Sequence, residues 1–190
     1  MYRTERYQSR TTVENYMENY VDIPCFLEYC KECNNYGKSW SCPPFDFSAE
    51  DYWKQYKYLY LIGTKIIFDE ETISKVNGKE DVKQILNDVL DKEKNKLADI
   101  LFEVEKRYPN SISLSAGSCS YCQSCERIGG NPCTYPEKIR YSIEALGGNV
   151  GLTCSKLMNI ELLWSEEGKL PAYFTVVSGF LTNDDEVNFD

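Results

Sequence analysis

The chain has 190 residues, of which 42% are hydrophobic, so it can bury one sizeable core but hardly two independent ones. Its formal net charge is −9 and no run of Lys and Arg interrupts the acidic balance, which argues against binding to nucleic acid or to an anionic membrane. The absence of His excludes Ser-His-Asp and Cys-His catalytic sites, HExxH zinc proteases and Cys2His2 fingers.

The nine cysteines are clustered in the sequence. The N-terminal residues contain no apolar stretch that resembles a signal peptide, and no segment has the ~20 apolar residues needed to cross a bilayer. We therefore expect a cytoplasmic protein. Because thiols are kept reduced in that compartment, clustered cysteines are more typical of metal ligands than of disulfides, with free structural cysteines as the alternative.

In chain order, residues 1–24 form a polar, Tyr-rich N-terminal segment, and the first cysteine segment, 25–42, is predicted to be a loop closed by Pro43-Pro44. Residues 57–69 mix aromatic and β-branched residues and predict a central strand, either continuous or broken at Gly63. From 81 to 108, apolar residues recur at steps of three and four before Pro109. This pattern predicts a long amphipathic helix that covers one face of the sheet.

Downstream, residues 112–114 predict a short strand that enters the second cysteine segment, 119–133. A helix is predicted over 137–146, begun by Pro136 and ended by two glycines, and strands are predicted over 150–153 and 172–181. The acidic tail, 182–190, is predicted to be frayed. An α+β or α/β arrangement fits this order, and we favour an α+β single domain over 25–181, with a mixed sheet covered by helices and two cysteine-rich cluster-binding loops.

The second cysteine segment carries the strongest motif, Cys119-x2-Cys122-x2-Cys125-x7-Cys133. Three closely spaced cysteines let a short loop bind three corners of a cubane cluster, and the longer gap leaves Cys133 free to complete the same cluster. A tetrahedral zinc site usually takes two CxxC pairs from separate hairpins. We therefore predict a 4Fe-4S cluster here, with zinc as the less favoured alternative.

The first cysteine segment reads Cys25-x4-Cys30-x2-Cys33-x8-Cys42. Its start matches the plant-type two-iron spacing, whereas the nearby Cys42 suits a compact four-iron loop or a zinc knuckle. We favour a second 4Fe-4S cluster bound by these four residues. Cys154 is assigned to packing, and it becomes a candidate ligand mainly if Cys25 is not one.

Other residues near the cysteines have a functional and a structural interpretation. Ser39 and Arg127 can donate hydrogen bonds to cluster sulfur or simply belong to polar loops, and aromatic residues such as Trp40 can shield a cluster or pack in the core. Arg140 can pair with Glu144 along a helix, or it can hold an anionic substrate beside the cluster.

The run from Cys30 to Pro44 resembles the CxxC-x-x-YG-x-x-W-x-CPP signature of the domain of unknown function 2284 family, which contains predicted cysteine-rich metal-binding proteins. The likeness continues through Cys119, Cys122, Cys125 and Cys133 to Arg140-x-Ser142-x-Glu144-Ala145-x-Gly147, so it covers most of residues 25–180. This resemblance implies a small prokaryotic metal-binding protein, with iron–sulfur as the expected metal chemistry. It implies no particular reaction. Cys25 and Cys154 lie outside the signature.

Three functions follow from these observations. The first is an electron carrier or redox subunit with two 4Fe-4S clusters, whose acidic charge suits a basic redox partner protein. The second is an enzyme in which a cluster with three Cys ligands leaves one iron open to a small-molecule substrate, as a Lewis acid or sulfur carrier. The third is an interaction module that zinc stabilises.

Overall fold

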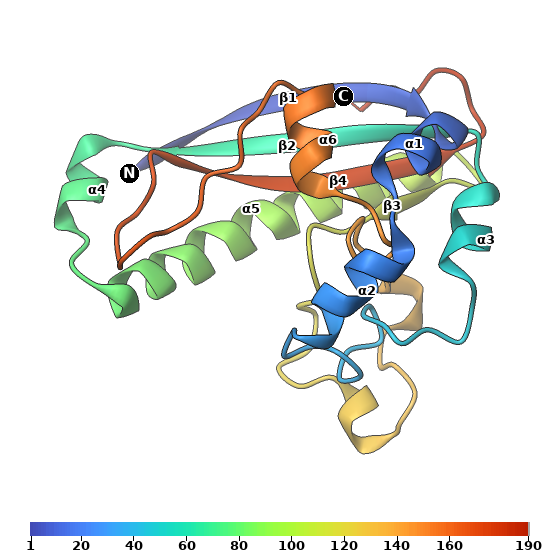
Figure 1. Ribbon diagram of the computed structural model, residues 1–190, viewed down its shortest axis with the longest axis horizontal. Coiled ribbons are helices and arrows are strands. Elements are labelled where there is room, and N and C mark those ends of the chain that lie inside the picture. Colours follow the sequence, from blue (N-terminus) through green and yellow to red (C-terminus); the bar gives the residue numbers. More distant parts are fainter. Residues whose placement is uncertain (190) are drawn as a thin grey trace.

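The sheet at the centre of the fold has the strand order β1-β2-β4-β3 (Figure 1). A computed structural model describes residues 1–189, and its four strands are Tyr2–Thr12 (β1), Tyr58–Phe68 (β2), Ile112–Leu114 (β3) and Tyr173–Thr182 (β4). All three strand pairs are antiparallel. The α+β class is therefore confirmed, although the sheet is antiparallel and not mixed.

Helices surround the sheet and connect its strands. Their bounds are Val13–Tyr20 (α1), Ile23–Lys31 (α2), Ala49–Lys54 (α3), Glu70–Lys75 (α4), Lys79–Arg107 (α5) and Val150–Leu157 (α6). Two short 3-10 helices, Glu126–Gly129 (η1) and Pro136–Lys138 (η2), lie in and after the second cysteine segment. Within residues 1–189, no helix is both long and apolar enough to span a bilayer.

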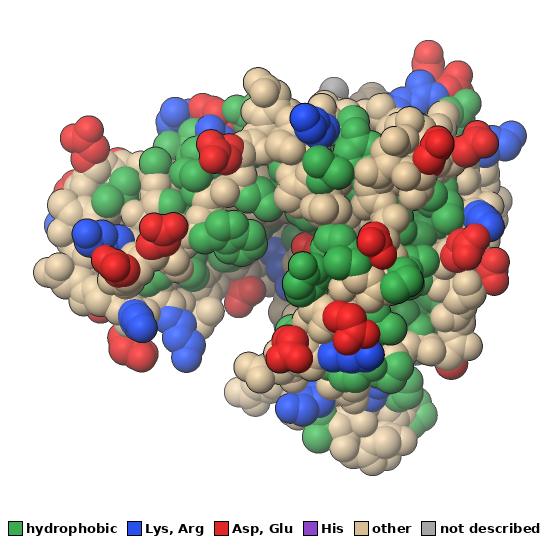
Figure 2. Space-filling view, in the orientation of Figure 1, with side chains coloured by type: hydrophobic (Ala, Val, Ile, Leu, Met, Phe, Trp, Pro, Cys, Tyr) green, Lys and Arg blue, Asp and Glu red, His purple; other side chains and the backbone are tan. Residues whose placement is uncertain are grey.

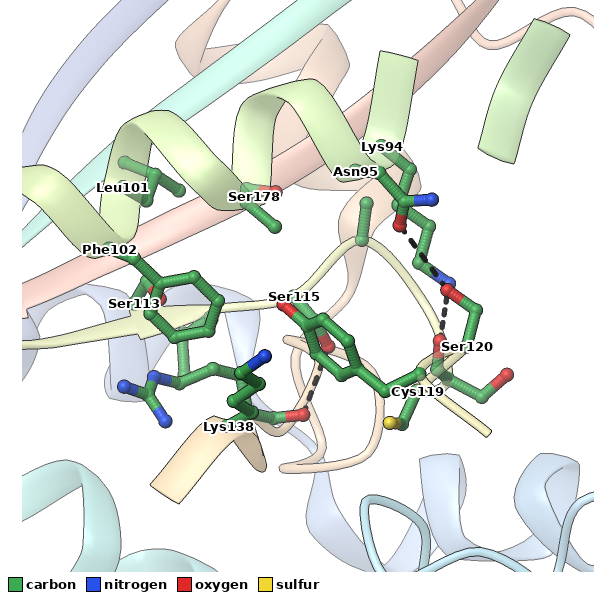
Figure 3. Close-up of a pocket in the computed structure, with 16 residues that line it drawn as sticks. Lys94, Asn95, Leu101, Phe102, Ser113, Ser115, Cys119, Ser120, Lys138 and Ser178 are labelled. Carbon is green, nitrogen blue, oxygen red and sulfur yellow. Dashed lines mark hydrogen bonds between the residues drawn. The ribbon is translucent and has the colours of Figure 1, made fainter. Parts of the chain in front are cut away.

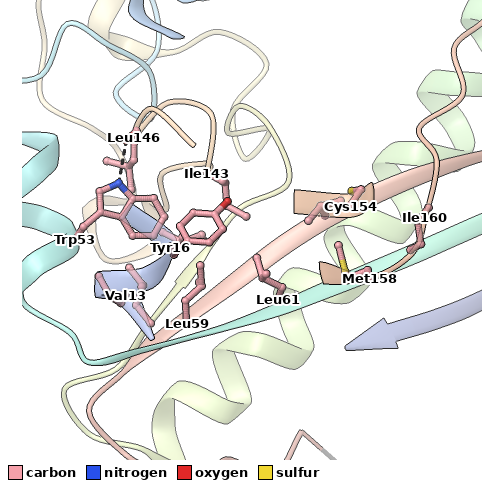
Figure 4. Close-up of a cluster of buried hydrophobic side chains, with 13 residues drawn as sticks. Val13, Tyr16, Trp53, Leu59, Leu61, Ile143, Leu146, Cys154, Met158 and Ile160 are labelled. Atoms are coloured by element: carbon pink, nitrogen blue, oxygen red, sulfur yellow. Dashed lines mark hydrogen bonds between the residues drawn. The ribbon is translucent and has the colours of Figure 1, made fainter. Parts of the chain in front are cut away.

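Successive side chains of a strand point to opposite faces of the sheet. Both faces of this sheet carry apolar side chains, and helices pack on each of them. On one face, Ile62 of β2 and Phe180 of β4 pack against helix α5 through Leu97, Leu101 and Val104. On the other face, Leu59, Leu61 and Val177 pack with residues of α1, α3 and α6 (Figure 4). The predicted long helix is thus confirmed, and so is the interior position of β2, which runs through Gly63 without a break.

Two downstream elements differ from prediction. Residues 137–146 form no α-helix: after η2 the backbone of Ile139 becomes extended, and the Tyr141 carbonyl accepts a hydrogen bond from the Ser115 N–H at 2.9 Å. A hydrogen bond to a residue distant in sequence thus stabilises an extended backbone where the local sequence predicted a helix. Residues 150–153 belong to helix α6 and not to a strand, because the Asn149 side chain caps the helix by accepting from the Leu152 N–H at 2.8 Å.

The two ends of the chain are also more ordered than predicted. The polar N-terminal segment contributes β1, an edge strand with alternating burial, followed by α1. The acidic tail is not frayed up to residue 189: the Phe189 ring lies 5.6 Å from that of Phe180, and the Asn188 N–H donates to the Tyr108 hydroxyl at 2.9 Å. Asp190 lies outside the described residues. The ordered structure of these two segments was not predicted, because each is mostly polar and packs through only a few aromatic side chains, which give no apolar periodicity.

Gly147 stands where the chain turns back onto helix α2. Its φ is +88°, and a Cβ atom there would lie 2.6 Å from Ile23 Cγ1 and 2.7 Å from Ile23 Cα. We expect Gly147→Ala to lower the free energy of unfolding by about 2–4 kcal/mol through backbone strain and overpacking. Urea denaturation measures this change. Gly151→Ala is the matched control, because its Cβ makes only an ordinary contact in helix α6, and a loss as large in that variant would contradict the explanation.

Candidate metal centre

The four thiols of the second cysteine segment lie around one small pocket. The walls of this pocket also include residues of the first cysteine segment and several aromatic side chains; its lining comprises Cys119, Cys122, Cys125, Cys133, Ser39, Trp40, Ser41, Tyr121, Tyr135 and Ile139. The loop from β3 to η2 brings the thiols together, with η1 as its only helical turn among the described residues. The predicted quartet is therefore a group in space as well as in sequence.

The electrostatics of this group favour a bound cation. Burial raises the pKa of the Cys119 thiol, and the nearby thiols of Cys122, Cys133 and Cys125 raise it further. Four thiolates in this loop would repel one another, so a positive charge among them is needed to stabilise the ionised form. A metal supplies that charge.

The first cysteine segment begins on a helix and not in a loop. Asp22 caps α2 by accepting from the Cys25 N–H at 3.1 Å, and Pro24 occupies the first turn. Both are helix start signals that the sequence itself contains. At 3.6 residues per turn, Cys25 and Cys30 lie about 140° apart around the helix axis, and Cys25 is exposed.

Three thiols of the first segment also form a group, called here the first thiol group, and the four thiols of the second segment are the second thiol group. The Cys33 N–H donates to the Cys30 carbonyl at 3.0 Å as the chain leaves α2, and the loop then returns to place Cys42 nearby. Burial raises the pKa of Cys30, and the charges of Cys42 and Cys33 raise it further. The structure therefore gathers Cys30, Cys33 and Cys42, while Cys25 lies on another side of the helix.

Neither group is contracted around a single ion. Among residues 1–189, no three Cys, Asp or Glu side chains are close enough together to enclose one metal ion. A tetrahedral zinc site holds each sulfur about 2.3 Å from the metal.

Comparison with known proteins shows the family to which this cysteine-rich chain belongs. The family model of predicted metal-binding proteins, DUF2284, matches residues 18–180. The chain belongs to this family. This match confirms the resemblance that the two cysteine signatures indicated. Metal binding is the property predicted for the family. Neither a curated protein nor a solved structure is similar enough to match the chain.

In this DUF2284 protein the two cysteine segments pack directly against each other, below the sheet in Figure 1. The Ser41 hydroxyl connects them, because Ser41 Oγ accepts from the Cys119 N–H at 2.9 Å and lies 3.9 Å from Cys42 Sγ. Trp40 Nε1 also donates to the Asn131 carbonyl at 3.0 Å. The sequence carried no signal for the role of Ser41, since it depends on a contact between segments 78 residues apart.

Arg127 is the strongest polar link between the segments of the DUF2284 protein. Its guanidinium donates to the carbonyls of Ser39 at 2.8 Å, Cys42 at 2.6 Å and Pro44 at 2.5 Å. The same group lies over the Trp40 ring, 5.0 Å from its centroid. Arg127 thus holds the first cysteine loop by its backbone, and its charge also acts on the Cys42 thiol; the predicted hydrogen bond to cluster sulfur stays a prediction.

We expect Arg127→Gln to loosen the first cysteine loop without unfolding the sheet. Three charge-assisted hydrogen bonds are lost, so transient opening of the loop should increase about tenfold or more. The measurement is the rate at which a chelator removes metal from the DUF2284 protein. Arg6→Gln, an exposed change on β1, is the control, and equal release rates in the two variants would rule out this anchoring role.

A basic pocket adjoins the second thiol group (Figure 3). It lies between helix α5 and the start of the second cysteine segment, with Cys119, Lys138 and Arg140 among its lining residues. Lys94 extends from α5 and donates to the Ser118 carbonyl. Burial lowers the pKa of Lys94, while the charges of Asp91, Cys119 and Cys42 oppose that shift, so the ammonium lies near both thiol groups.

Neither interpretation of Arg140 offered by the sequence describes its main contact. Arg140 pairs with Glu105 of helix α5, with Nε donating to Oε1 at 2.8 Å, and not with Glu144. The pairing with Glu144 was wrong because residues 137–146 form no helix. Since Glu105 already neutralises the guanidinium, Arg140 serves mainly to hold the segment that follows the second cysteine loop.

Cys154 lies in the hydrophobic core and not at either thiol group (Figure 4). Its side chain on α6 is completely buried beside Tyr16, Leu61 and Met158. Burial raises the pKa of this thiol to about 12, with a smaller contribution from Glu144. A thiol held so strongly in its neutral form is a packing residue, as the sequence predicted.

Proposed function

We propose that this DUF2284 protein is an iron–sulfur protein that carries electrons for a partner. In this proposal Cys30, Cys33 and Cys42 hold the first 4Fe-4S cluster, with Cys25 as the predicted fourth ligand, and Cys119, Cys122, Cys125 and Cys133 hold the second. Such clusters accept and release single electrons. The chain's own residues hold, shield and charge-balance these groups.

The observation that carries the proposal is the convergence of all four thiols of the second segment on one pocket. Their close sequence spacing lets one short loop supply several corners of a cubane, and cubane ligands are farther apart than those of a single ion. The two thiol groups also meet at Ser41, which suits electron exchange between neighbouring centres.

Residues around the thiols have the properties that a redox centre requires. Trp40, Tyr121 and Tyr135 line the pocket with aromatic surface, while the Ser41 hydroxyl lies within hydrogen-bonding distance of Cys42 Sγ. Lys94 places a positive charge near both groups, which favours their reduced, more negative state. The net charge of −9 complements a basic redox partner protein.

Metal and sulfide analysis of anaerobically purified protein tests the proposal. Two four-iron clusters predict about eight iron and about eight acid-labile sulfide per chain, and a brown colour that bleaches on reduction. Electron paramagnetic resonance of the reduced protein then counts the centres. A colourless protein that contains only zinc would refute the proposal and establish the zinc-stabilised module instead.

One observation favours a second candidate, an enzyme with an open iron. Because Cys25 and Cys30 face different sides of α2, the structure gathers only three thiols in the first group among the described residues. A cluster with three Cys ligands offers one iron to a substrate as a Lewis acid. Cys25→Ser separates the candidates: an unchanged spectrum of the first cluster supports the open iron, and loss of that cluster supports four Cys ligands.

A further inference from the structure

A second, larger pocket lies apart from the pocket that contains the four thiols. It has a volume of about 420 Å³, within the range typical of small-molecule sites. Its walls come from α2, the loop before Cys119, α6, the segment before β4, and β4 itself. Figure 2 shows a hollow between the sheet and the cysteine loops, and Figure 1 shows the ribbons of these elements in the same orientation. No cysteine lines it among the described residues.

The walls of this pocket are mostly apolar. Phe26 of α2 and Trp164 provide aromatic surface, and Leu162, Val150 and Val176 provide aliphatic surface. Trp164 is 72% exposed although it is one of the largest apolar side chains in the protein. An apolar wall of this kind is stabilised when a ligand covers it.

Two buried polar atoms in this pocket have no partner. Glu144 Oε2 and Thr175 Oγ1 are both inaccessible to solvent and form no hydrogen bond, and both residues line the pocket. Only one other such side-chain atom, Tyr52 Oη, occurs among the described residues. Because an unsatisfied buried polar group costs about 1–3 kcal/mol, two of them in one pocket point to a ligand that completes their hydrogen bonds.

The chemistry of these two atoms limits the ligand. A carboxylate oxygen accepts, and a threonine hydroxyl both accepts and donates, so a group with several donors satisfies both. A primary ammonium has three N–H donors and also brings the charge that a buried carboxylate lacks. Burial raises the pKa of Glu144, and the hydrogen bond with Ser142 and the charge of Lys94 oppose this shift without cancelling it, so an ammonium beside Oε2 would favour the ionised carboxylate. Lys94 does not fill this position, because its ammonium is directed to the Ser118 carbonyl and forms no ion pair with Glu144.

We propose that this pocket binds a small organic amine, with its apolar body against Phe26 and Trp164 and its ammonium group on Glu144 and Thr175. No cysteine lines this site among the described residues, although the charge of Glu144 acts on the Cys30 thiol. It gives the protein a small-molecule ligand in addition to its metal.

Three indoles with the same body and different polar groups test this proposal. Equilibrium dialysis against anaerobically purified, metal-loaded protein compares tryptamine, tryptophol and indole-3-acetate, which present an ammonium, a hydroxyl and a carboxylate. Tryptamine should bind at least about tenfold more tightly than indole-3-acetate, because an ammonium donates to a carboxylate and balances its charge, whereas a second carboxylate is repelled. No saturable binding of tryptamine, or equal binding of all three, would overturn the proposal.

Variants then assign the contacts. Glu144→Gln should weaken tryptamine binding by about tenfold or more and abolish the preference for the ammonium, whereas the exposed Glu166→Gln should change neither. Trp164→Ala should weaken all three probes alike. If Glu144→Gln does not fold, Thr175→Val provides the second test, with a loss of several-fold for tryptamine. Unchanged affinity in the folded Glu or Thr variant rejects the site, while the metal content of each variant reports independently on the clusters.

Discussion

Cys122→Ser is expected to remove the second cluster and leave the rest of the protein folded. About half of the iron and sulfide should be lost, because the four thiols around this pocket act as one ligand set and the first thiol group has its own cysteine ligands. Serine has nearly the same shape as cysteine but is a poor ligand for iron in a sulfur cage. Metal and sulfide analysis, together with the spectrum of the reduced protein, measures the loss.

Cys154→Ser is the matched control for that change. This thiol is completely buried in the core, so its replacement should leave the iron content unchanged and lower the free energy of unfolding by about 1–3 kcal/mol, the cost of burying an unpaired hydroxyl. Full iron content in Cys122→Ser would contradict the assignment of the second cluster. Loss of iron in Cys154→Ser without loss of stability would show that this thiol is a ligand.

Glu105→Gln is expected to destabilise the protein by about 3–5 kcal/mol. Glu105 accepts hydrogen bonds from the Ser113 N–H at 2.7 Å and the Ser113 hydroxyl at 2.6 Å, before the second cysteine loop, and from Arg140, after it. The side chains of the ion pair are only 14% and 13% exposed. Removal of the carboxylate therefore leaves a largely buried guanidinium without a counter-ion.

Urea denaturation of the metal-loaded protein measures this effect, and metal release should begin at a lower urea concentration than in the unchanged protein. Glu103→Gln is the control, because its pair with Lys106 is 69% exposed on both sides and contributes about 0–1 kcal/mol. A loss below about 1 kcal/mol in Glu105→Gln would show that helix α5 does not clamp the two ends of the loop.

The sequence pattern correctly predicted the helices and strands that contain many regularly spaced apolar residues. Strands β2 and β4 and helix α5 each contain enough regularly spaced apolar residues for the period to identify them. Elements that depend on contacts distant in sequence were missed. Strand β1 is polar and pairs along the edge of β2, and residues 140–142 are drawn into an extended path beside Ser115.

The sequence by itself determined the family and the kind of ligand, because cysteine spacing and the absence of His limit the metal ligands that these loops can offer. Only the tertiary structure decided that the two cysteine segments meet at Ser41, that Cys25 faces away from Cys30, and that Arg127 and Glu105 hold the loops in place. The reason is physical: ligand spacing is a property of one short loop, whereas buried hydrogen bonds and ion pairs join residues that the fold alone brings together.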